Sequence, residues 1–168
     1  MKQSKDNLID SLTGLKNRHF AENHLHDKLL KTRNVASPFP LLFLDIDHFT
    51  SLINRYGFFA GEITLQKVSS LLRREMPGRD IIIRWNEDQF ILILSTLVKG
   101  THLYDVANRL SFLIRDAAFE YQNQLIQITV SIGATLSRPE DSADSLIYRA
   151  KQLTHCSKEK GGGDIGIG

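Results

Sequence analysis

Four acidic residues in two short segments have types and spacing that could support phosphate chemistry. Asp45 and Asp47 end an apolar run of strand length, and Glu87 and Asp88 lie in a polar turn between two further apolar runs. Residues two apart on an extended chain project to the same side. Carboxylates gathered in this way repel one another unless solvent or a cation lies between them. Oxygen ligands suit Mg²⁺ or Mn²⁺, which link protein carboxylates to substrate phosphates in phosphoryl-transfer sites. The alternative is that these acids are merely solvated.

The elements that must position these acids follow from hydrophobic periodicity. It predicts helices over about 17–33, 61–75, 103–117 and 142–160, and strands over 41–46, 81–85, 90–94 and 126–132. Without the first and last helices the order is β-α-β-β-α-β, an α+β, ferredoxin-like fold with helices against an antiparallel-rich sheet. In that sheet the first strand lies beside the central hairpin. The last strand alternates apolar and polar residues, which predicts one buried face.

Composition restricts the class of protein. The chain has 168 residues, 42% of them hydrophobic, and a net charge of +2, which predicts one folded domain and excludes a dedicated nucleic-acid binder. A single cysteine, Cys156, excludes an internal disulfide and a multi-cysteine zinc site. No apolar run is long enough to span a membrane and no secretory signal opens the chain, so we expect a cytoplasmic protein without membrane insertion. We expect residues 1–8 to be a linker and 9–168 a single domain, cut from a longer chain.

Five segments along the chain carry a joint resemblance. They are DSLTGLKNR at 10–18, DIDHF at 45–49, YG at 56–57 with GE at 61–62, RWNEDQF at 84–90 and TVSIG at 129–133. In this order they resemble the GGDEF domain, the family that condenses two GTP molecules into cyclic dimeric GMP. The resemblance implies a nucleotidyl-cyclase palm fold, GTP as the ligand and Mg²⁺ or Mn²⁺ as the cofactor.

The family's signature Gly-Gly-Asp/Glu-Glu-Phe is altered here to Asn86-Glu87-Asp88-Gln89-Phe90. The resemblance implies that Asp45, the carbonyl of Ile46 and Asp88 hold the metal. Gln89 replaces the glutamate that the family uses in catalysis with a neutral amide, so no catalytic residue is assigned. Glycines at a hairpin tip permit positive φ and close approach to a ligand. Asn86 tolerates that conformation better than Glu87, whose carboxylate would face the triphosphate.

The nucleotide site departs from the family pattern as well. Thr50 replaces a phosphate-binding lysine, Ile53 replaces the asparagine that hydrogen-bonds guanine, and Glu62 keeps the guanine-reading acid on a longer arm. Lys158 matches a phosphate-contacting lysine. A hydrogen bond lost in a buried site costs about 1–3 kcal/mol, so the changes at positions 50 and 53 should weaken GTP binding about a hundredfold or more. The implied nucleotide-binding positions are Phe49, Thr50, Ile53, Glu62, Asn86, Glu87 and Lys158.

The family's product-inhibition motif, Arg-x-x-Asp, is also incomplete. Asp80 is present, but Pro77 replaces the arginine. We therefore expect Asp80 to have a structural role in a turn rather than to bind cyclic dimeric GMP.

These departures predict a degenerate, catalytically inactive GGDEF domain that serves as a regulatory, nucleotide-sensing or protein-interaction module in cyclic di-GMP signalling. Its partners would be other domains of a longer signalling protein, a separate signalling protein or a second copy of the chain. Because Asp45 and Asp88 are retained, a weakly active diguanylate cyclase or a Mg²⁺-dependent nucleotide triphosphatase is the alternative. A dimerisation unit that binds no nucleotide is a third interpretation.

Overall fold

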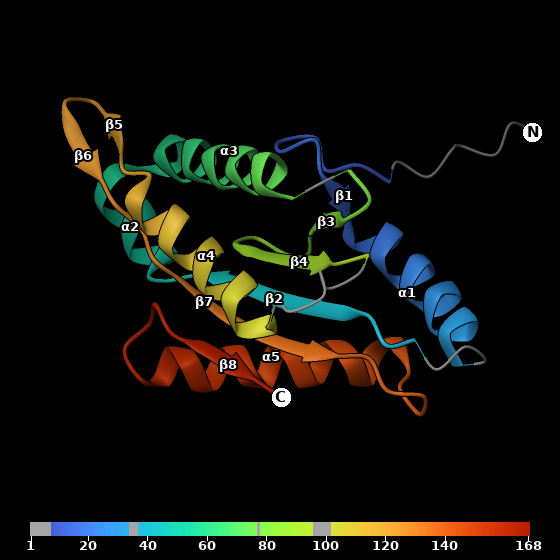
Figure 1. Cartoon of the computed structure of the whole chain (residues 1–168). Coiled ribbons are helices and arrows are strands. Elements are labelled where there is room, and N and C mark those ends of the chain that lie inside the picture. The colour runs from blue at the N-terminus through green and yellow to red at the C-terminus, as the bar shows by residue number, and fades with distance from the viewer. Residues whose placement is uncertain (1–7, 34–36, 77, 96–101) are drawn as a thin grey trace, which may run out of the picture.

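The computed structural model describes residues 8–33, 37–76, 78–95 and 102–168, which form a six-stranded mixed sheet with helices on both faces (Figure 1). The strand order is β1-β3-β4-β2-β7-β8. The strands of this sheet are β1 (Lys16–Asn17), β2 (Pro40–Ile46), β3 (Ile81–Arg84), β4 (Gln89–Ile93), β7 (Val130–Leu136) and β8 (Ile165–Ile167). A separate two-stranded hairpin consists of β5 (Phe119–Tyr121) and β6 (Gln124–Ile126). The helices are α1 (Arg18–Arg33), α2 (Phe49–Tyr56), α3 (Phe58–Glu75), α4 (Leu103–Asp116) and α5 (Ala143–Glu159).

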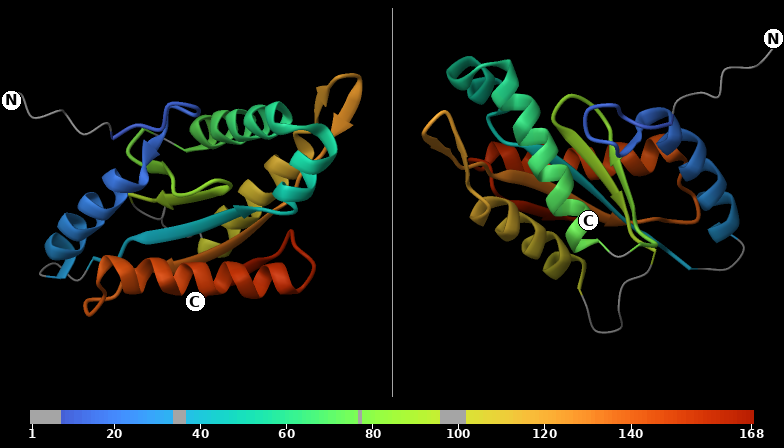
Figure 2. Two further views of the ribbon diagram at one scale, coloured as in Figure 1. Left: turned by 180° about the vertical axis from the view of Figure 1, so that it is seen from behind. Right: turned by 90° about the horizontal axis from the view of Figure 1, so that it is seen from above.

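Strand β2 lies at the centre of the sheet and pairs antiparallel with β4 on one side and β7 on the other. All of its residues are buried, which explains its nearly continuous apolar run. Leu42 and Leu44 pack in one core with α2, α3 and α4, whereas Leu41 and Phe43 pack in a second core with α1 and α5. Figure 2 shows α3 and α5 on opposite sides of the sheet. The end of β2 is therefore close to helices on both faces.

The predicted β-α-β-β-α-β order and α+β class are confirmed, as β2, α2 with α3, β3, β4, α4 and β7. The predicted helices agree with α1, α3, α4 and α5 to within a few residues at their ends. Helix α2, strand β8 and the β5–β6 hairpin were not predicted. Residues 1–7 lie outside the described part of the chain, so the expected linker is not described.

The prediction of one strand over 126–132 with one buried face is wrong. Ile126 ends β6, and β7 begins at Val130 and is buried on both faces apart from its last residue. Its small residues Gly133 and Thr135 face α5, and Thr135 Oγ1 accepts a hydrogen bond of 3.0 Å from Arg149 Nε. A Cβ atom added to Gly133 would lie 2.1 Å from the carbonyl oxygen of Ala150, so this glycine allows α5 to lie directly against the strand.

Helix α5 is fixed at two points along its length. In its second turn, Arg149 forms an ion pair with the buried Asp141, with Nη2 and Oδ2 2.8 Å apart. Burial alone would raise the pKa of Asp141, but hydrogen bonds from Arg149 and the Arg138 backbone amide outweigh it and hold that pKa below its usual value. Further along, Thr154 Oγ1 donates to the carbonyl of Phe43 in β2 at 3.0 Å. These contacts hold the last turn of α5, which carries Lys158, at the end of β2. In the described part of the chain, no helix is long and apolar enough to cross a membrane.

Candidate functional site

The end of β2 and the turn between β3 and β4 meet, as the sequence predicts. Asp45 is paired in register with Gln89, the first residue of β4. One residue further along, the backbone amide of Ile46 donates to the carbonyl of Asp88 at 3.1 Å. The proposed metal ligands therefore lie side by side, with Asp45 and Ile46 at the end of β2 and Asp88 in the turn just before β4.

Both carboxylate oxygens of Asp45 have partners within the protein. Gln89 donates from Nε2 to Oδ2 at 2.8 Å. The ammonium of Lys158 forms an ion pair with Oδ1 and lies 3.5 Å from the carbonyl oxygen of Ile46. A cavity of about 180 Å³ lined by Asp45, Gln89, Lys158 and neighbouring α5 residues lies beside this group. Asp45 is thus neutralised by the protein's own groups.

Asp88 is partly buried and lies near the charges of Asp45 and Lys158. Burial raises the pKa of its carboxyl group, and the charge of Asp45 raises it further. The ammonium of Lys158 acts in the opposite direction. The positive charge of Lys158 near Asp88 therefore favours the ionised form of Asp88.

The proposed ligand atoms are of the kind that binds a hard divalent cation. Two carboxylates, from Asp45 and Asp88, and the carbonyl of Ile46 offer only oxygen atoms, which Mg²⁺ and Mn²⁺ prefer. Gln89 and Lys158 each contact one oxygen of the Asp45 carboxylate, so a metal there would compete with both side chains. Such a cation would supply charge stabilisation for nucleotide phosphates.

The expected gathering of four carboxylates is not observed. Across residues 8–33, 37–76, 78–95 and 102–168, no three acidic, histidine or cysteine side chains form a group that could hold a metal ion. Asp47 accepts hydrogen bonds of 2.7 Å from Thr129 Oγ1, Ser131 Oγ and the Gly163 amide. It therefore holds the glycine-rich tail against β7 instead of joining Asp45 in a cation site.

The turn that carries the altered signature has no left-handed residue. The non-glycine residues with positive φ in the described chain are His48, Gln122 and Asn123, so Asn86 and Glu87 keep ordinary backbone angles. A side chain from β3 stabilises the turn, because Arg84 Nη2 donates to the carbonyl of Glu87 at 2.9 Å. The left-handed conformation considered for this tip is thus not used, and the loss of glycine at these two positions causes no backbone strain here.

A cavity of about 470 Å³ lies between the signature turn, α2 and α3. Four of the predicted nucleotide-binding residues line it, namely Phe49, Ile53, Glu62 and Glu87. The remaining three lie elsewhere. Thr50 and Asn86 are exposed and do not line this cavity, and Lys158 lines the smaller one beside Asp45.

The side chain of Ile53 packs closely against α3. A Cβ atom added to Gly61 would lie 2.9 Å from Ile53 Cγ1, so the glycine makes room for the larger apolar side chain. Ile53 brings no hydrogen-bonding group to the cavity, whereas Glu62 on the same wall brings a carboxylate.

Sequence reasoning missed two charged residues in the wall of this cavity, Asp10 and Arg84. They form an ion pair, with Arg84 Nη1 3.1 Å from Asp10 Oδ1. Burial alone would raise the pKa of Asp10, but hydrogen bonds from Thr13 and the Arg84 guanidinium outweigh it and lower that pKa. Asp10 lies in the family-like segment 10–18 and Arg84 in the segment 84–90. Their place in these segments could have identified them as site residues.

A sequence profile for the family described as "Diguanylate cyclase, GGDEF domain" matches residues 7–164. The chain belongs to the GGDEF domain family. Among curated proteins, the diguanylate cyclase DgcP of Pseudomonas aeruginosa is 28% identical over 161 residues, which cover 95% of this chain and 24% of DgcP. The signaling protein YkoW of Bacillus subtilis is 31% identical over 153 residues, which cover 90% of this chain and 19% of YkoW. The matched GGDEF region is thus under a quarter of either relative.

Solved GGDEF domains share the fold of this chain. The GGDEF domain of DgcB from Caulobacter crescentus, in complex with c-di-GMP, superposes with a TM-score of 0.89 at 22% identity, covering 99% of this chain and 96% of that one. The GGDEF domain of FimX from Pseudomonas aeruginosa gives a TM-score of 0.83 at 22% identity, with 96% and 99% coverage. The nucleotidyl-cyclase palm implied by the sequence is therefore confirmed.

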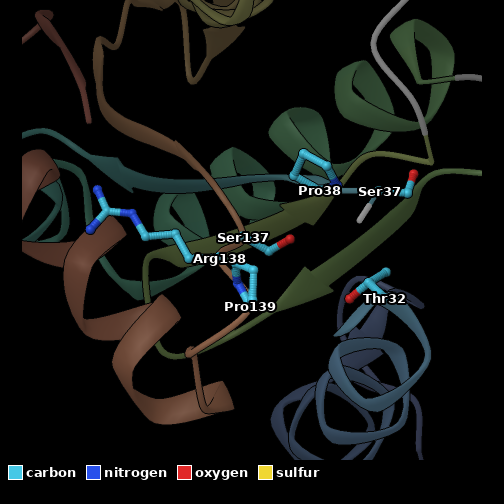
Figure 3. Close-up of a pocket in the computed structure, with 6 residues that line it drawn as sticks. All are labelled: Thr32, Ser37, Pro38, Ser137, Arg138 and Pro139. Carbon is cyan, nitrogen blue, oxygen red and sulfur yellow. The ribbon is translucent and has the colours of Figure 1, made fainter. Parts of the chain in front are cut away.

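In this GGDEF domain Asp80 has a structural partner. Its Oδ1 accepts a hydrogen bond of 2.8 Å from the backbone amide of Ser95, which follows β4. Pro77, which replaces the arginine of the family's inhibitory motif, lies outside the described residues. A further cavity, of about 190 Å³, is lined by Thr32, Pro38, Arg138 and their neighbours (Figure 3) and includes none of the predicted site residues.

Proposed function

We propose that this GGDEF domain is a catalytically inactive regulatory module of cyclic di-GMP signalling that binds a guanine nucleotide without condensing it. The observation that carries the proposal is the hydrogen bond from Gln89 Nε2 to Asp45 Oδ2. At the position of the family's catalytic glutamate, this chain has a neutral donor that binds one of the retained acids. An amide cannot accept a proton from a reacting hydroxyl or add charge to a cation site.

The 470 Å³ cavity beside the signature turn is the proposed nucleotide site. Phe49 and Ile53 give it an apolar wall, and Glu62 gives it an acceptor for the amino or imino hydrogens of a purine. Ile53 has no donor for a purine carbonyl, so we expect weak affinity. The phosphates would lie toward Glu87, Asp88 and Lys158.

A divalent cation in this site would be held by Asp45, Asp88 and the carbonyl of Ile46. When bound, it would neutralise the charge that these groups and the nucleotide phosphates share. Thr50, which is exposed on α2, supplies no positive charge to assist it.

The proposed partners are other domains or other signalling proteins. The chain spans 19–42% of the length of the first three curated relatives, so a regulatory module in a longer protein is consistent with its size. One solved relative, SiaD of Pseudomonas aeruginosa, is described in complex with its activator SiaC. An association of this chain with a partner protein or with a second copy is proposed by analogy.

One observation favours a second candidate, a weakly active cyclase or a Mg²⁺-dependent nucleotide triphosphatase. Asp45 and Asp88 remain close enough for the charge of one to raise the pKa of the other. Such a pair could hold a metal against a triphosphate even without the glutamate.

Calorimetric titration with GTP, with and without Mg²⁺, tests the proposed binding. We expect measurable affinity that Ile53→Asn strengthens about tenfold, since one hydrogen bond to the base is regained. Asn54→Ala, an exposed change at the next position, should leave the affinity unchanged. Absence of GTP binding by the wild type would contradict the nucleotide-sensing role and favour a protein-interaction module.

A further inference from the structure

We propose that Lys158 is a built-in competitor for the divalent cation, so that a metal binds this domain only when the ammonium leaves Asp45. The inference deepens the proposed function, because it rests on the metal ligands assigned there. It concerns the free domain, before any nucleotide is present.

The contacts of Lys158 coincide with two of the three proposed ligands. Its ammonium is paired with Asp45 Oδ1 and lies 3.5 Å from the Ile46 carbonyl oxygen. The pair is well shielded, since the side chain of Asp45 is 11% exposed and that of Lys158 32% exposed. One ammonium thus contacts two of the three proposed ligands at once.

The helix that delivers Lys158 is firmly attached to the sheet. Thr154, one turn earlier on α5, is 3% exposed and donates to the carbonyl of Phe43, two residues before Asp45 in β2. Ser157, next to Lys158, is buried and donates to the carbonyl of Leu153 at 3.0 Å. The ammonium can therefore leave Asp45 by a change of side-chain rotamer while α5 stays in place.

A metal and the ammonium cannot share these ligands. Two cations within about 4 Å repel each other strongly at the effective dielectric of a partly buried site. Gln89 donates a hydrogen bond to the other oxygen of Asp45, so a cation at that oxygen would have to share it with the amide. We therefore expect weak divalent-ion affinity in the free domain. Nucleotide phosphates would attract Lys158 away from Asp45, so the nucleotide and the metal should strengthen each other's binding.

The test is a Mn²⁺ titration of the whole 168-residue chain without nucleotide, followed by electron paramagnetic resonance of free Mn²⁺. Lys158→Met keeps the apolar stem and removes the charge, and it should bind Mn²⁺ about tenfold more tightly than the wild type. Lys158→Arg keeps the charge and should retain the weak affinity of the wild type. Lys151→Met is the matched control, because Lys151 lines the same cavity on the same helix while Lys158 makes the ion pair with Asp45.

A double variant tests whether the additional Mn²⁺ affinity arises at Asp45. Asp45→Asn added to Lys158→Met should abolish the gain in Mn²⁺ affinity. Equal affinity of the wild type and Lys158→Met, no binding by either, or an equal gain in Lys151→Met would overturn the proposal. Because no nucleotide is present, failure here is distinct from failure of the proposed nucleotide binding, which the GTP titration measures separately.

Discussion

Gln89 and Asp45 face each other across the β2–β4 ladder, and the side-chain amide of Gln89 donates to Asp45 Oδ2 at 2.8 Å. A glutamate at position 89 would bring two carboxylates into contact at the same place, which is stable only with a cation or a proton between them. The glutamine removes this requirement. The free domain can therefore keep the Asp45 carboxylate buried and hydrogen-bonded without a metal.

Gln89→Glu should destabilise the metal-free domain by about 1–3 kcal/mol at neutral pH, because it replaces a hydrogen bond by a repulsion between like charges. Urea unfolding followed by circular dichroism measures the change. Addition of Mn²⁺ should restore part of the lost stability by binding only the folded state. The same substitution at the exposed Gln124 on β6 is the control and should have little effect. Equal stability of Gln89→Glu and the wild type would show that the Gln89–Asp45 bond contributes nothing.

Asp88→Asn should change how stability depends on pH. The pKa of Asp88 is raised above its ordinary value of 3.8 by burial and by Asp45. Its ionisation therefore opposes folding, and the wild type loses stability as the pH rises from 3.8 through the raised value. The asparagine variant avoids this loss, so its advantage over the wild type should grow between pH 3.5 and pH 7 in urea unfolding.

For Asp164→Asn we expect the opposite change of stability with pH. A hydrogen bond from the Ile165 backbone amide lowers the pKa of Asp164, so its ionised form favours folding. This variant should lose stability relative to the wild type as the pH rises from that lowered pKa to the ordinary value of 3.8, below the range in which Asp88 acts. The same pH trend in both variants would contradict the environments described for the two acids.

Gly133→Ala should destabilise the domain by about 3 kcal/mol, the upper end of the range for overpacked cores, because the added Cβ would lie 2.1 Å from the Ala150 carbonyl oxygen. Thermal unfolding measures the effect. Gly78→Ala is the matched control, since a Cβ at that glycine has open space and should leave the unfolding temperature nearly unchanged. A stable Gly133→Ala variant would show that α5 can shift away from β7.

Much of the fold could be predicted because hydrophobic periodicity marks long elements clearly. The buried run at 41–46 and the 3.6-residue pattern of α4 both correspond to observed elements. Short elements were missed because their burial depends on distant partners. Strand β8, for example, is a glycine-rich segment in the sequence and becomes a strand by pairing with Ile132 to Ala134 of β7.

The candidate site was predictable as a set of positions but not as a set of contacts. The sequence predicts that Asp45 and the signature turn meet, and they do. It did not predict that Asp47 accepts hydrogen bonds from Thr129 and Ser131, because the partners of a side chain depend on the neighbouring strands. Its assignment of Lys158 to phosphate stays a prediction, and it did not predict the ion pair with Asp45, which depends on how α5 docks on β2.

Reversion toward the family pattern tests the cause of the proposed inactivity. We expect some cyclase activity from a chain that combines Asn86→Gly, Glu87→Gly, Gln89→Glu, Ile53→Asn and Thr50→Lys. The changes restore the base contact, a phosphate-binding charge and the catalytic carboxylate, and chromatography of the nucleotide products detects cyclic di-GMP. A folded revertant that binds GTP and forms no product would show that other residues cause the inactivity.

Catalytic inactivity is tested most directly by overnight incubation of the wild-type chain with GTP and Mg²⁺, followed by chromatographic separation of the nucleotides. We expect GTP to be recovered unchanged under conditions where the calorimeter shows it to be bound. Cyclic di-GMP in the mixture would instead show an active cyclase, and GDP would show a triphosphatase.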